Sequence, residues 1–239
     1  MLQKSIRHLS IIHWRNRDIG LEVFLELTSP PIFLETLYLW GRLSVLPPWI
    51  SSLSYLIELS LRENFLDGEL LGQLEKLPSL VSLKLYHESF MGTHLCFEKK
   101  KLFPRLKKLI IDNAPNLDEL RFDGGAPNLE SLTLAFEREP ANGIFGIENL
   151  PKLMEVEFFG ETIVDSLVQG MIAEAKFHPN RPRVYIEKIE LSRTTPNNPV
   201  DIIDPMYVDN IYISFCGLLD CFSIFFAQKT GRQSNTYYC

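Results

Sequence analysis

The sequence predicts a solenoid of the α/β class, with a parallel sheet along a concave side, irregular loops along the convex side and a helical cap at the C-terminal end. Two observations lead to this prediction. A leucine pattern recurs every 22–28 residues from Ile6 to about residue 159, and a segment of helical periodicity follows its last copy.

The leucine pattern is complete once, in residues 56–66. This stretch reads L-x-x-L-x-L-x-x-N-x-L, which is the core of a leucine-rich repeat. Weaker copies begin at Leu34, Leu80, Leu106, Leu129 and Leu153, and a degenerate first copy consists of Ile6, Leu9 and Ile11. From Leu34 onward the starts lie 22, 24, 26, 23 and 24 residues apart, so we expect about seven stacked units.

Each L-x-L triplet is expected to form a short strand, because alternate residues of a strand point to the same face. One such strand cannot bury its leucines alone, whereas strands stacked about 4.8 Å apart join them into one core. Asn64 suits the turn that leaves the strand, since its amide can bond to backbone groups there. Pro47 and Pro48 make a regular helix unlikely on the returning arm.

A C-terminal cap is predicted over residues 160–190. Apolar residues follow Thr162 at helical spacing, the helix is expected to end before His178-Pro179, and residues 184–186 have the composition of a closing strand. The predicted domains are therefore repeats at 1–159, the cap at 160–190 and a divergent tail at 191–239, either disordered or folded back on the cap. Within the tail, the apolar run 211–227 is too short to favour a membrane span.

Composition restricts the classes of function. The chain has 239 residues, 46% of them hydrophobic, and a formal net charge of −6, which argues against nucleic-acid binding. Four cysteines form no disulfide framework, and charged residues interrupt any N-terminal signal sequence. These features predict a cytoplasmic protein for which a membrane span is not expected, with peripheral membrane association left open.

Known catalytic and cofactor motifs do not occur. The sequence has no H-E-x-x-H, G-x-S-x-G or G-x-x-x-x-G-K-[ST] pattern, so we expect no enzyme activity and no cofactor. His87, His94 and Cys96 lie close in sequence but lack a second pair of ligands at a matching spacing. A loop histidine and a buried thiol are favoured over a zinc site.

The concave face offers the candidate binding residues. Positions between and after the leucines of successive triplets form two columns of side chains on that face. Aromatic and arginine side chains dominate binding hot spots, and the same residues could instead simply stack on one another across the sheet. The candidates for protein interaction are Tyr38, Trp40, Arg62, Lys84, Tyr86 and Phe159.

Several segments resemble one group of leucine-rich repeats, those of the coiled-coil class of plant nucleotide-binding disease-resistance proteins. The resemblance covers roughly residues 1–190. It is carried by residues 29–31, 34–43, 46–53, 103–109, 124–130 and 146–153.

The resemblance implies a module that senses a pathogen effector or a guarded host protein, or that holds a nucleotide-binding domain inactive. No phosphate loop is present, so the chain resembles the sensor half alone. The alternative is an intracellular scaffold or adaptor without an immune role.

Overall fold

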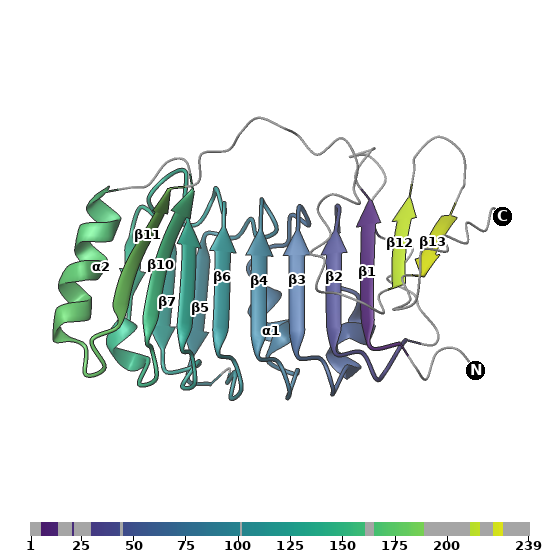
Figure 1. Ribbon diagram of the computed structural model, residues 1–239, viewed down its shortest axis with the longest axis horizontal. Helices are drawn as coiled ribbons and strands as arrows, with labels where there is room; N and C mark the ends of the chain where they lie inside the picture. Colours follow the sequence, from purple (N-terminus) through teal and green to yellow (C-terminus); the bar gives the residue numbers. More distant parts are fainter. Residues whose placement is uncertain are drawn as a thin grey trace.

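Ten strands form one sheet that runs along the molecule, called here the main sheet (Figure 1). The computed structural model describes residues 6–13, 21, 30–43, 45–100, 102–160, 165–188, 211–215 and 222–226. In spatial order the strands are β11 (Arg183–Lys188), β10 (Glu155–Gly160), β8 (Ser131–Ala135), β6 (Lys108–Asp112), β4 (Ser82–Tyr86), β3 (Glu58–Arg62), β2 (Thr36–Trp40), β1 (His8–His13), β12 (Ile211–Phe215) and β13 (Phe222–Phe226).

The seven strands from β1 to β10 in this sheet coincide with the seven predicted repeats, and all of them pair in parallel. Their register aligns equivalent leucines: Leu59 lies opposite Leu37 on one side and Leu83 on the other. These leucines are fully buried. The predicted fold class, a leucine-rich solenoid with a parallel sheet, is therefore confirmed.

Asparagine side chains donate hydrogen bonds to carbonyls of the preceding unit at several places, and two of them illustrate the pattern. The Asn64 amide is buried and donates a hydrogen bond to the Gly41 carbonyl at 2.6 Å, as its position in the repeat predicts. At the lead-in to the strands, the Asn128 amide donates to the Pro104 carbonyl, one repeat earlier, at 2.5 Å. Each bond joins two successive repeats and gives a partner to a backbone carbonyl that lies outside the strands.

The convex side is more regular than expected in its central part. A second parallel sheet, called here the convex sheet, contains β5 (His94–Glu98), β7 (Glu119–Asp123) and β9 (Gly143–Phe145). It lies behind the main sheet in Figure 1. Elsewhere this side carries the short helix α1 (Leu70–Leu74) and the 3-10 turns η3 (Pro48–Ser52) and η4 (Ile147–Asn149).

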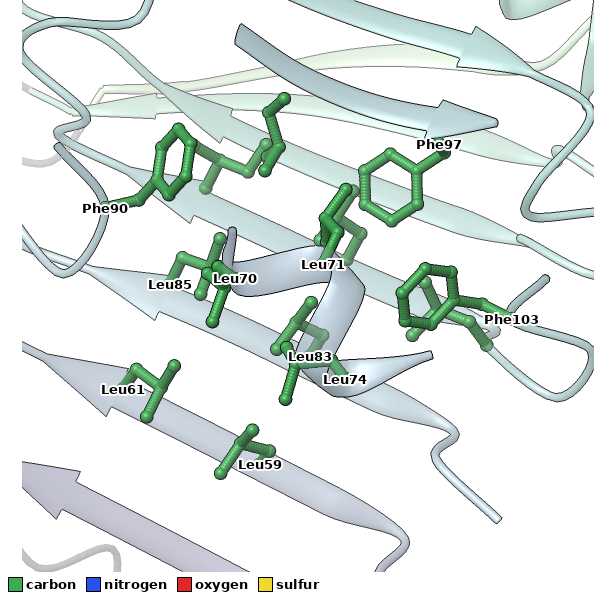
Figure 2. Close-up of a cluster of buried hydrophobic side chains, with 14 of the residues drawn as sticks. Leu59, Leu61, Leu70, Leu71, Leu74, Leu83, Leu85, Phe90, Phe97 and Phe103 are labelled. Carbon is green, nitrogen blue, oxygen red and sulfur yellow. The ribbon is translucent and has the colours of Figure 1, made fainter. Parts of the chain in front are cut away.

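Both layers share one hydrophobic core. Phe97 of β5 and Phe122 of β7 stack with ring centroids 5.2 Å apart, and both side chains are fully buried. Figure 2 shows the leucines of α1 lying between the β4 leucines and Phe97. The helix α1 and the strand β5, which belong to neighbouring repeats, therefore both pack against the leucines of the main sheet.

Two glycines permit the close passage of the chain over the convex sheet. A Cβ on Gly125 would lie 2.5 Å from the Phe97 carbonyl, and one on Gly146 would lie 2.1 Å from the Phe122 carbonyl oxygen. Gly146 also has a φ of +79°, which is unfavourable for residues with a side chain. Each glycine lets the chain of one repeat cross the end of the preceding convex strand.

The predicted helical cap is confirmed by α2 (Asp165–Phe177), which is followed by β11 on the edge of β10. Leu167, Val168 and Met171 of α2 are buried in the core cluster. Thr162, predicted to begin this helix, lies outside the described residues. No helix among the described residues is both long and apolar enough to cross a membrane.

Two strands of the tail are described, and both belong to the main sheet. β12 pairs in parallel with β1, and β13 pairs antiparallel with β12. This part of the tail therefore lies at the opposite end of the sheet from α2 (Figure 1). The boundaries at 159 and 190 between repeats, cap and tail remain predictions.

Candidate functional site

The open face is defined here as the face of the main sheet that points away from the leucine core. The strand registers arrange its side chains in columns, as the sequence predicts. The middle column contains Ser10, Tyr38, Ser60, Lys84, Ile110, Thr133 and Glu157, and the next contains Ile12, Trp40, Arg62, Tyr86, Asp112, Ala135 and Phe159.

Five of the six predicted binding residues gather on the three neighbouring strands β2, β3 and β4. We call this group the aromatic patch: Tyr38, Trp40, Arg62, Lys84 and Tyr86. Within it, Arg62 stands in register with Trp40 on one side and Tyr86 on the other. Its guanidinium carbon lies 4.9 Å from the Trp40 ring centroid, within range of a cation–π contact.

Tyr38 lies beside this arginine and is only partly accessible. Burial raises the pKa of the Tyr38 phenol to about 12, because the charged phenolate is poorly solvated there; the nearby Arg62 charge opposes the shift. The phenol therefore stays protonated at neutral pH. It can act as a hydrogen-bond donor beside the exposed part of the Arg62 side chain.

Trp40 contributes less accessible surface than its position on the open face suggests. Its side chain is only 8% exposed, and its indole Nε1 has no hydrogen-bond partner among the described residues. The Arg62 Nε is likewise without a hydrogen bond within the described part of the chain. The Trp40 ring therefore packs against the Arg62 guanidinium and adds little accessible surface. The accessible surface of the patch belongs mainly to its other four residues.

Three pairs of basic and acidic side chains lie in or beside the patch and were not anticipated from the sequence. Lys84 Nζ lies 2.7 Å from Glu58 Oε1, and Arg62 Nε lies 3.8 Å from Glu63 Oε1. At the border of the patch, His87 Nε2 lies 3.4 Å from Asp112 Oδ2. Burial raises the pKa of Asp112, although His87 and Arg62 act in the opposite direction. Glu58 could have been found by reading a third column of the same alternation, two positions before Ser60 on β3.

Phe159 lies apart from the other candidates. It is on β10, three strand intervals from Tyr86, which corresponds to about 14 Å at the usual strand spacing. It stands in register with Glu187 of β11 and is partly buried. The structure thus assembles five of the predicted residues into one patch and leaves Phe159 beside the C-terminal cap.

The residues weighed as a zinc site are placed on different layers. His87 follows β4 of the main sheet, whereas His94 and Cys96 are on β5 of the convex sheet. The pKa of the Cys96 thiol is raised, first by burial and then by the Glu119 carboxylate. Over the described ranges, no group of three His, Cys, Asp or Glu side chains is arranged to hold a metal.

The repeat pattern, the parallel sheet and the open face agree with a family comparison. The family described as leucine-rich repeat region matches residues 1–184. The chain belongs to the leucine-rich repeat family. Within this leucine-rich repeat protein, the aromatic patch lies on the N-terminal half of the matched region.

Relatives of this leucine-rich repeat chain are plant disease-resistance proteins, which confirms the resemblance found in the sequence. Disease resistance protein PIK6-NP of Oryza sativa subsp. japonica is 28% identical over 183 residues, 69% of this chain and 17% of the relative. Disease resistance protein RPM1 of Arabidopsis thaliana is 34% identical over 149 residues, 62% of this chain and 16% of the relative. The chain thus spans about a sixth of the length of these relatives.

Proposed function

We propose that the protein is a non-catalytic protein-recognition module in plant defense, acting in the cytoplasm like the sensor or autoinhibitory repeats of an immune receptor. The observation that carries the proposal is the aromatic patch. Its arginine, two tyrosines and lysine lie together on one face of a rigid sheet, and such residues dominate protein-binding hot spots. The disease-resistance relatives support the biological context.

The chemistry of the patch favours a protein partner over a small molecule. Arg62, Tyr38 and Tyr86 offer a guanidinium and two phenols on aromatic surface, which suits backbone and side-chain acceptors. The net charge of −6 disfavours nucleic acid. The partner classes are a pathogen effector, a guarded host protein or the nucleotide-binding domain of a disease-resistance protein.

The binding test uses Arg62→Glu and Tyr86→Ala in the full chain. The probes are the purified nucleotide-binding domain of a plant disease-resistance protein and a panel of purified pathogen effectors, measured by titration calorimetry. For any probe that binds wild type, we expect each variant to weaken binding at least tenfold, which corresponds to about 1.4 kcal/mol. Arg62→Glu reverses the charge of the patch arginine, whereas Tyr86→Ala removes an aromatic side chain that would contact the partner.

Matched controls change the same residue types away from the open face. Arg138→Glu alters an arginine that bonds to the Pro115 carbonyl and Asp118, and Tyr55→Ala alters a tyrosine that is 56% exposed. Both controls should bind like wild type. If the controls and the patch variants bind equally, the patch is not the site. If neither class of probe binds wild type, the adaptor function without an immune role is favoured instead.

A further inference from the structure

The edge of β1 carries a strand from the other end of the chain. β12 pairs with it over five residues, and the register sets Ile211 and Ile213 opposite Leu9 and Ile11. Leu9 and Ile11 belong to the buried core cluster and are 6% and 1% exposed. β12 therefore occupies the place that a preceding repeat strand would take in the stack.

The sequence leading into β12 independently matches a repeat. Residues 205–213, which end within β12, can be aligned without gaps to residues 31–39, which end within β2. At each position the two segments have the same type of residue. The first segment reads Pro205-Met206-Tyr207-Val208-Asp209-Asn210-Ile211-Tyr212-Ile213, and the second reads Pro31-Ile32-Phe33-Leu34-Glu35-Thr36-Leu37-Tyr38-Leu39. The two segments share the same order of residue types: proline, an apolar residue, an aromatic residue, an aliphatic residue, an acidic residue, a short polar residue and an aliphatic-Tyr-aliphatic triplet.

Two properties of the backbone are compatible with this arrangement. The chain from 189 to 210 can reach about 75 Å at about 3.5 Å per residue. The strands between β11 and β12 span about 40 Å at the usual spacing. One molecule can therefore place its own β12 on its own β1, without exchange with a second copy.

We propose that β12 and β13 belong to a displaced leucine-rich repeat that docks on the β1 edge and closes the stack on that side. Repeat stacks need a terminal unit at each end, because an open edge leaves leucines and backbone hydrogen-bonding groups unpaired. β12 continues the parallel ladder, and β13 then reverses direction and ends the regular stack. While β12 is docked, no further strand can pair with this edge of β1, because β2 occupies the other edge.

A disulfide test measures the pairing directly. Ser10 and Tyr212 are register partners in the parallel pair, at a separation suited to a disulfide. Ser10→Cys is combined with Tyr212→Cys in a chain whose four native cysteines (Cys96, Cys216, Cys221 and Cys239) are replaced by serine. Mild oxidation should give a cross-link within single chains, seen by non-reducing electrophoresis and peptide mass spectrometry.

The matched control combines Ser10→Cys with Ser223→Cys. Ser223 is on β13, in register with Ser214, and so lies two strand intervals from β1, too far for a disulfide. A cross-linked dimer from the Ser10–Tyr212 pair would show that β12 docks on a second copy. That result, the absence of any cross-link, or equal cross-linking of the control would each overturn the proposal.

A second measurement keeps the native cysteines. Ile213→Asp introduces a charge at a position in register with the buried Ile11, whereas Tyr212→Asp introduces the same charge at a position in register with Ser10, which is only partly buried. By hydrogen exchange, β1 amides should exchange at least about tenfold faster in Ile213→Asp and remain unchanged in Tyr212→Asp. Strands β4 to β10 serve as the internal reference. Unchanged β1 exchange in Ile213→Asp would overturn the docking.

Discussion

The main sheet and the convex sheet bury the same core by different means. The main sheet repeats one small unit, a triplet of the L-x-L type, and every unit contributes two apolar side chains to a continuous ladder. The convex sheet has three strands in the described part of the chain, and beside the aliphatic Leu95, Leu120 and Ile144 it contributes the large rings of Phe97 and Phe122. Where it is absent, α1 and the turn η3 supply Leu70, Leu71, Leu74, Trp49 and Ile50 instead.

The difference shows which layer tolerates variation. A parallel ladder of main-chain hydrogen bonds fixes the spacing of the main sheet, so each unit must supply a strand. The convex side only has to cover the leucines, and a strand, a helix or a turn can each do so. We therefore expect the main sheet to respond to damage at any repeat, and the convex side to depend on its few large residues.

The largest expected effect is that of Phe97→Ala in the convex sheet. Phe97 is fully buried and contacts the rings of both Phe103 and Phe122. Its removal should lower the free energy of unfolding by about 3–5 kcal/mol, measured by urea denaturation. Phe145→Ala, in the same sheet but 42% exposed, is the control and should cost less than about 1 kcal/mol. Equal losses would show that this sheet does not cover the core.

Leu59→Ala tests the main sheet and should have a slightly smaller effect. Leu59 is fully buried between Leu37 and Leu83, and its truncation leaves a cavity in the ladder. The expected loss is about 2–5 kcal/mol in the same measurement. Ile57→Ala, two residues earlier and 44% exposed, is the matched control. A denaturation midpoint unchanged from wild type would contradict the burial of Leu59.

The smallest expected effect concerns the open face and depends on pH. The folded-state pKa of Tyr38 is about 12, above the usual value of 10.0, so the folded protein holds this proton more tightly than the unfolded chain. The associated stability is complete below pH 10 and is lost as the pH rises towards 12, by at most about 3 kcal/mol. Tyr38→Phe lacks this loss, so the stability difference between wild type and variant should change over that range. Parallel pH profiles would exclude a buried phenol.

The sequence was sufficient to predict the repeats, because each L-x-L triplet has only one way to bury its leucines. The same reasoning predicted the columns of the open face, since alternation in a strand fixes which residues share a face. Tyr38, Trp40, Arg62, Lys84 and Tyr86 were therefore found together. Their assembly into one patch, and their place on neighbouring strands, follow from the regular repeat length.

Other features were encoded in the sequence but were not recognised there. The alternation in His94-Leu95-Cys96-Phe97 and Glu119-Leu120-Arg121-Phe122 signals a second strand in each repeat, as does the nine-residue likeness between 205–213 and 31–39. The convex strands lie between the leucine triplets, and the segment 205–213 lies far beyond the last predicted repeat at Leu153. The regular spacing of the repeats therefore predicts neither.

By itself, the sequence determined the solenoid, the leucine core, the helical cap and the membership of the open face. Only the tertiary structure decided how accessible each open-face residue is, which ion pairs border the patch and which strand lies on the β1 edge. The physical reason is that periodicity fixes local geometry, namely which face a side chain occupies. Burial of Trp40, the Lys84–Glu58 pair and the docking of β12 all depend on groups that are distant along the chain.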